Sequence, residues 1–144
     1  MVDRDVVVDT TFSRGEWRVD RTLVVTMGAT LTLAPGARLS FGEGTQLRVE
    51  RGTLLARGTE TEPITLTSSA SVPGSGHWGG VVLADPKGKA SALDHVHLAY
   101  VDGKAALLVR GAAKVELGNV EITDCGGAGI VLESAPGGGG SITF

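Results

Sequence analysis

Six polar residues in the second half of the chain have types and spacings that could support chemistry. They are Asp94, His95, His97, Asp102, Asn119 and Glu121. Paired carboxylates can perform general acid/base catalysis, and histidines can exchange protons or bind metals. His97 precedes Glu121 by 24 residues, and His95 precedes Asn119 by the same spacing. These side chains meet only if the chain returns to the same position about every 24 residues.

Two interpretations of this polar cluster are open. The first is a carbohydrate-binding or polysaccharide-cleaving face, in which His97 and Glu121 would form the centre. The second is structural, because outward polar side chains on adjacent strands pair with each other and contribute well under about 1 kcal/mol. We favour the structural interpretation. We predict no metal site, since His95 and His97 need a third ligand that the sequence does not place, and we predict no cofactor.

Short apolar pairs, each alternating inward, outward and inward, give the chain the required periodicity. An alternation of period two is typical of half-buried strands, and Gly, Pro or charged residues separate the pairs. The pairs start about every eight residues, so that three of them return the pattern to its origin after about 24. The first-half pairs are Leu31/Leu33, Leu39/Phe41, Leu47/Val49, Leu54/Ala56 and Ile64/Leu66.

The periodicity predicts which residues stack on one another in successive turns, here called coils. A longer corner at residues 60–63 is expected to absorb the extra residue between Leu39 and Ile64. The predicted stacks are Leu23 on Leu47, Leu31 on Leu54, Leu39 on Ile64, Val96 on Val120, Leu98 on Ile122, Leu107 on Ile130 and Val109 on Leu132.

The pattern predicts an all-β fold, a three-sided solenoid of about five coils; the family resemblance given below implies that this solenoid is a right-handed parallel β-helix. Its 22 glycines suit many corners, and aromatic residues make up only 4% of the chain, which suits a narrow aliphatic core. We expect an N-terminal strand or cap at residues 1–16, the β-helix at 17–134 and a Gly-rich tail or cap at 135–144. A cap is expected because an open solenoid end exposes unpaired backbone groups.

Several segments carry a family resemblance. They are LTLAPG at 31–36, LSF at 39–41, GTLLARGT at 52–59, PITLTSS at 63–69 and WGGV at 78–81. In this order they resemble bacterial right-handed parallel β-helix repeat proteins of the surface or secreted type, within the pectate-lyase-like superfold. The resemblance implies the fold and a surface or secreted module. Trp78 is expected to cover a corner of the helix.

Composition argues against several other classes. The net charge of −3 and the absence of a basic stripe argue against nucleic-acid binding. No apolar run is long enough for a membrane span. The lone Cys125 cannot form an internal disulfide. Leu55 interrupts the Thr-x-Thr pattern around Thr32 that a regular ice-binding face would need.

The preferred function is therefore a non-enzymatic structural or interaction scaffold. The alternative is carbohydrate binding or cleavage near His97 and Glu121. Self-association through the ends of the β-helix is a further expectation, because solenoids grow along one dimension unless they are capped. We expect an extracellular or cell-surface location, reached by a leader that this sequence lacks, and leave the cytoplasm open.

Overall fold

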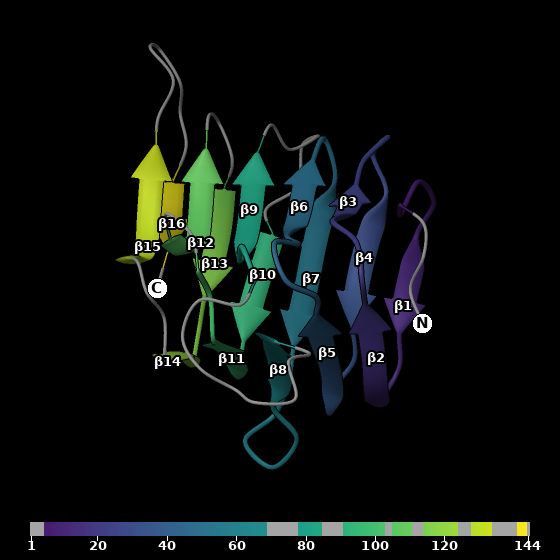
Figure 1. Ribbon diagram of the computed structural model, residues 1–144, viewed down its shortest axis with the longest axis vertical. Helices are drawn as coiled ribbons and strands as arrows, with labels where there is room; N and C mark the ends of the chain where they lie inside the picture. Colours follow the sequence, from purple (N-terminus) through teal and green to yellow (C-terminus); the bar gives the residue numbers. More distant parts are fainter. Residues whose placement is uncertain are drawn as a thin grey trace.

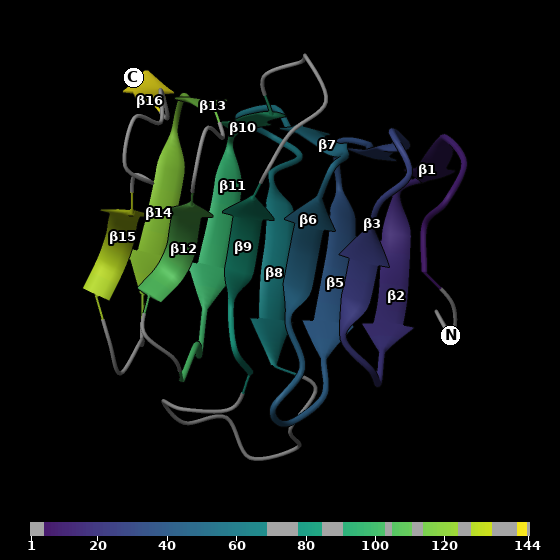
Figure 2. The same cartoon turned by 90° about the horizontal axis from the view of Figure 1, so that it is seen from above.

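The chain winds into a three-sided parallel β-solenoid, whose successive coils lie side by side between the N-terminal and C-terminal ends (Figures 1 and 2). The computed structural model describes residues 5–68, 78–84, 91–102, 105–110, 114–123, 128–133 and 141–143. Every strand pairs in parallel with the strands three elements before and after it. The predicted all-β, three-sided parallel β-helix is confirmed.

Three sheets form the sides of the solenoid. Sheet 1 contains β1 (Thr10–Phe12), β4 (Thr30–Leu33), β7 (Thr53–Arg57), β10 (Ser91–Asp94), β13 (Lys114–Leu117) and β16 (Ser141–Thr143). Sheet 2 contains β2 (Gly15–Val19), β5 (Ala37–Phe41), β8 (Ile64–Ser68), β11 (Val96–Ala99) and β14 (Val120–Thr123). Sheet 3 contains β3 (Leu23–Val25), β6 (Leu47–Glu50), β9 (Val81–Ala84), β12 (Ala105–Arg110) and β15 (Ala128–Glu133).

The core consists of aliphatic side chains stacked from coil to coil. In sheet 3, Leu23, Leu47, Val81 and Leu107 are consecutive register partners, and all four are fully buried. Burying each such side chain contributes about 1.5–3 kcal/mol. The stack therefore stabilises the fold and fixes the register, because a one-residue slip would turn every apolar side chain outward.

Most of the predicted stacking is confirmed. Leu23 lies on Leu47, and Leu31 lies on Leu54. In the later coils, the predicted pairs of β11 with β14 and of β12 with β15 are also present.

One predicted register was wrong. Leu39 pairs with Leu66 rather than with Ile64, and Phe41 pairs with Ser68. The corner after β7 contains two more residues than expected, and it is closed by a hydrogen bond from Thr59 N to Glu62 O (3.0 Å). A shift of two residues leaves the inward face unchanged, so the core accommodates it.

Trp78 lies inside the solenoid and does not cover a corner. Its side chain is fully buried, and its ring stacks on Phe41 with the centroids 4.4 Å apart. Its Nε1 donates to Ala99 O at 2.7 Å. The register partner of Phe41 is the small Ser68, which cannot cover the phenyl ring. The indole of Trp78 covers it instead, in place of a larger residue on the neighbouring strand.

Some expectations concern residues outside the described ranges. These are Cys125 and the Gly-rich segment at 135–140. Within the described residues, no helix is long and apolar enough to cross a bilayer.

Candidate functional site

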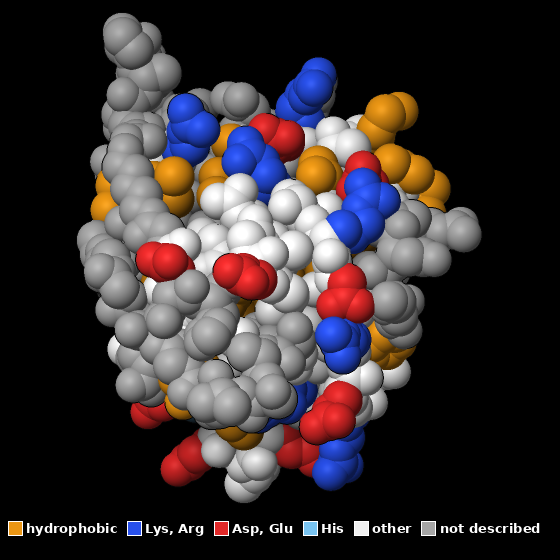
Figure 3. All heavy atoms as spheres, viewed as in Figure 1, with side chains coloured by type: hydrophobic (Ala, Val, Ile, Leu, Met, Phe, Trp, Pro, Cys, Tyr) orange, Lys and Arg blue, Asp and Glu red, His pale blue; other side chains and the backbone are white. Residues whose placement is uncertain are grey.

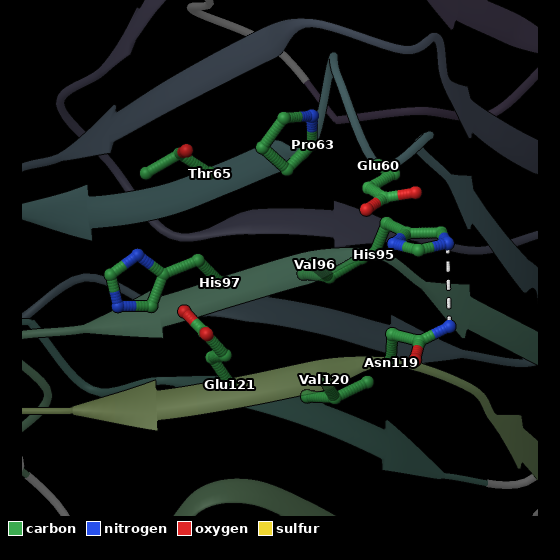
Figure 4. A pocket seen from close by; sticks show the side chains of 9 residues that line it. All are labelled: Glu60, Pro63, Thr65, His95, Val96, His97, Asn119, Val120 and Glu121. Carbon is green, nitrogen blue, oxygen red and sulfur yellow. Dashed lines mark hydrogen bonds between the residues drawn. The ribbon is translucent and has the colours of Figure 1, made fainter.

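The pairing of β11 with β14 brings most of the candidate polar residues onto the outer face of sheet 2. His97 and Glu121 are register partners, as the spacing predicts. An open depression of about 730 Å³ lies over this face (Figure 4). It is lined by Glu60, Pro63, Thr65, His95, Val96, His97, Asn119, Val120 and Glu121.

Asp94 and Asn119 join two coils at the edge of this depression. Asp94 Oδ1 accepts hydrogen bonds from Asn119 N (3.1 Å) and Asn119 Nδ2 (3.2 Å). The hydrogen bond from the Asn119 backbone N, and after it the one from the side-chain Nδ2, hold the pKa of the Asp94 carboxyl below its ordinary value. Asp94 can reach Asn119 because the intervening Gly118 has no side chain, and a Cβ there would collide with Asp94 Oδ1. The carboxylate is therefore held charged in a contact between coils.

His95 turns the chain from β10 into β11 in a left-handed conformation, with φ of 53°. Non-glycine residues adopt this region infrequently, and it is found at tight corners and functional sites. Its half-buried ring has Nε2 3.3 Å from Asn119 Nδ2, which donates to Nε2 in the tautomer that carries the ring proton on Nδ1. The same ring lies beside Glu60 in the depression (Figure 4).

The His95 corner is also fixed through its backbone. Ile64 N donates to His95 O at 2.9 Å, and Gly58 N donates to Asp94 O at 2.7 Å. A Cβ at Gly58 would lie 2.7 Å from His95 O, so glycine is needed for this close approach. The corner thus contacts both the preceding coil and the following coil.

His97 is held by the next coil rather than by Glu121 alone. Its Nε2 forms a hydrogen bond with Thr123 Oγ1 at 2.7 Å. Glu121 lies opposite His97 in the register, and its carboxylate is near the imidazole in the depression (Figure 4). This arrangement places an exchangeable proton and a carboxylate on one open face.

Asp102 does not join the cluster. It follows β11 at the end opposite Asp94, and its backbone N donates to Trp78 O at 2.6 Å. Asp102 is not among the residues that line the depression. Of the six candidates, the structure therefore gathers Asp94, His95 and Asn119 at one corner and His97 with Glu121 along the strands.

Sequence reasoning missed Glu60 and Thr65. Thr65 is the register partner of His97, although 32 residues separate them, because the coil between them contains the long segment at 69–77. The alternating pattern could have predicted that Thr65 lies on the outer face, because it is an outward residue between two inward ones. Among the described residues, no group of three or more His, Cys, Asp or Glu could hold a metal ion.

Comparisons with known proteins agree with this architecture. The model of the pectate-lyase like beta helix domain family matches residues 4–99, about two thirds of the chain. Comparisons with curated proteins and with solved structures gave no match. The matched region includes most of the described coils and the His95 and His97 side of the depression. The chain therefore belongs to the pectate-lyase like beta helix domain family.

Proposed function

We propose that this chain is a non-enzymatic scaffold, a rod that presents its lateral faces to partners. The observation that supports this most directly is the use of the candidate polar groups between coils. Asp94 accepts from Asn119, and His97 bonds to Thr123, each across one coil boundary. Side chains that form these hydrogen bonds serve to hold neighbouring coils together rather than to bind a substrate.

The interior supports the same proposal. The aliphatic stack is continuous from coil to coil, and no buried side-chain nitrogen or oxygen within the described residues lacks a hydrogen-bond partner. A core with satisfied polar groups favours one well-defined native state. Such a rod would present its outer faces at fixed spacings of about 4.8 Å between coils. We place this role outside the cell or at a bacterial cell surface.

A carbohydrate-binding or polysaccharide-cleaving role is the second candidate. It is favoured by the open depression and by the left-handed His95, which faces Glu60 there. Hydroxyl-rich ligands suit such a mixture of imidazole, amide and carboxylate groups. In this role, His97 and Glu121 would contact the sugar, and a polysaccharide would be the partner.

Glycan screening combined with thermal unfolding separates the two roles. The variants are His97→Ala and Asn119→Ala, with Glu43→Ala in an exposed corner as the control. The scaffold role predicts no glycan binding, a lower melting temperature for the first two variants and no change for Glu43→Ala. Glycan binding by the wild type that is lost in His97→Ala, with the melting temperature retained, would instead establish the sugar role.

A further inference from the structure

The two histidines of the depression differ in the kind of partner that each one has. His97 Nε2 lies 2.7 Å from Thr123 Oγ1, and His95 Nε2 lies 3.3 Å from Asn119 Nδ2. A hydroxyl group can donate or accept a hydrogen bond, whereas an amide NH2 group can only donate. His97 can therefore keep its hydrogen bond when it gains a proton, but His95 cannot keep the one from Nδ2.

Asn119 cannot adapt by turning its side-chain amide over. The same Nδ2 also donates to Asp94 Oδ1 at 3.2 Å. Asp94 stays charged in mild acid, because the hydrogen bond from the Asn119 backbone N holds its pKa below the ordinary value. A charged carboxylate only accepts, so the amide atom that faces it must be Nδ2 and not Oδ1. While His95 is neutral, the two hydrogens of Nδ2 thus serve two acceptors, Asp94 Oδ1 and His95 Nε2.

The backbone around His95 is held from both neighbouring coils. Ile64 N donates to His95 O at 2.9 Å, and Val96 N donates to Asn119 O at 3.1 Å. The main chain at His95 is also fixed in the left-handed conformation, with φ of 53°. The imidazole can therefore change its partner by rotating about its side-chain bonds while the corner keeps its path.

Carboxylates are the charged groups that face His95 among the described residues. Asp94 Oδ1, at the end of β10, lies 3.8 Å from His95 Nε2. Glu60, in the corner after β7, lies beside the ring in the depression (Figure 4). Glu121, on β14, lines the same depression but is the register partner of His97. A protonated His95 is therefore drawn toward a carboxylate, and Asp94 is already close to its Nε2.

No basic side chain among the described residues competes for these carboxylates inside the depression. Elsewhere on the molecule, acidic and basic side chains lie next to each other, as Figure 3 shows for one face. Arg18 and Asp20, for example, form an ion pair at 2.9 Å. The depression differs because histidine is the only side chain on its lining that can become positively charged.

We infer that His95 is a proton-operated switch on the outer face of sheet 2. When His95 is neutral, its Nε2 accepts from Asn119 Nδ2. When it is protonated, its Nε2–H turns from Asn119 to Asp94 Oδ1, and the separation of 3.8 Å shortens to about 2.8 Å. Asn119 keeps its bonds to Asp94, because a carboxylate has room for more than two donors. One hydrogen of its Nδ2 then loses its acceptor in the protein.

The switch changes what the depression offers to a partner. In the neutral state, both hydrogens of Asn119 Nδ2 are used within the protein. In the protonated state, one amide hydrogen and one imidazolium charge become available at the rim. Histidines gain their proton between about pH 8 and 5 in proteins. The inference goes beyond the scaffold role, because it makes one lateral face of the rod respond to mild acid.

The test is NMR spectroscopy of the 15N-labelled chain, following the side-chain NH2 of Asn119 from about pH 8 to 5. We expect the hydrogen that faces His95 to move toward the position of a free amide, while the hydrogen that faces Asp94 stays. His95→Asn should abolish the movement, and asparagine adopts left-handed φ more readily than most residues, so the corner is retained. His97→Asn is the matched control, and Asn119 should respond in it as in the wild type.

The inference is overturned if both amide hydrogens of Asn119 keep their positions over this pH range in the wild type. It is also overturned if a folded His95→Asn shows the same movement, or if His97→Asn abolishes it. Glu60→Gln should leave the response unchanged, and its loss there would identify Glu60 as the acceptor in place of Asp94. Should His95→Asn fail to fold, the wild-type titration and Glu60→Gln still decide. The scaffold role is tested separately by glycan binding and melting temperature.

Discussion

Asp94 Oδ1 accepts two hydrogen bonds from Asn119 of the next coil, one from the backbone N at 3.1 Å and one from the side-chain Nδ2 at 3.2 Å. This contact joins two sides of the solenoid at a corner, because Asp94 ends β10 of sheet 1 and Asn119 directly precedes β14 of sheet 2. Its geometry depends on Gly118 and on the deprotonated carboxylate. Both dependencies can be tested.

Gly118→Ala should break the contact between Asp94 and Asn119. The new Cβ would occupy the position of Asp94 Oδ1, so the carboxylate must rotate away and lose both donors. We expect a lower melting temperature and a rise in the pKa of Asp94 toward its ordinary value, measured by NMR titration. Gly129→Ala is the control, because its Cβ would make only an ordinary contact of 3.6 Å with Ile122. An unchanged pKa of Asp94 in Gly118→Ala would contradict this account.

Acid should weaken the same corner. The pKa of Asp94 is lowered in the folded chain, so its stabilising effect is present above the unfolded pKa and is lost as the pH falls through the folded value. The loss should therefore occur below about pH 4. We expect Asp94→Asn to lose less stability than the wild type in thermal unfolding between about pH 4 and 2.5. Parallel curves for the two proteins would show that the contact does not titrate.

Replacing Trp78 should destabilise the core. Trp78→Phe removes the donor to Ala99 O in a fully buried position, and we expect a loss of about 1–3 kcal/mol in urea unfolding. Trp78→Ala adds a cavity beside Phe41 and should cost about 3–5 kcal/mol. Trp17→Phe is the matched control, because Trp17 also stacks on a phenylalanine, Phe12, but is half-buried at the end of the rod. Equal losses for Trp78→Phe and Trp17→Phe would contradict the role given to burial.

Gly58→Ala should distort the corner that carries His95. The added Cβ would lie 2.7 Å from His95 O and 3.0 Å from Ile64 N, and both are backbone atoms that cannot rotate away. We expect a destabilisation of about 1–3 kcal/mol in urea unfolding. Broadened amide resonances at His95 and Ile64 should accompany it. A stability within about 0.5 kcal/mol of the wild type would show that the corner relaxes freely.

The sequence predicted the register wherever the corners between strands are short. Leu31 stacks on Leu54 as expected, because the intervening corners leave little freedom. The register of Leu39 failed because period-two alternation cannot distinguish a partner at Ile64 from one at Leu66. Both residues face inward, and only the folded corner decides between them.

The candidate site was also predicted only in part, because residue spacing gives the register of the strands but not the path of the corners. A constant spacing of 24 residues was enough to place His97 opposite Glu121. The bond between Asp94 and Asn119 was not predicted, because it depends on the missing side chain at Gly118 and on the direction in which Asp94 points. Glu60 lines the depression because it lies in the long corner after β7. The alternating pattern of the strands does not predict the path of that corner.

The pairing of every strand only with strands three elements away also determines how the rod would respond to force. A coil contacts only its two neighbours, so pulling on the ends would unravel the chain one coil at a time, from whichever end is held less firmly. Each coil of about 24 residues would release about 80 Å of extended chain. In a force–extension experiment, unfolding of the rod would then appear as a series of nearly equal rupture steps. One of these steps would be the release of the coil joined by Asp94 and Asn119.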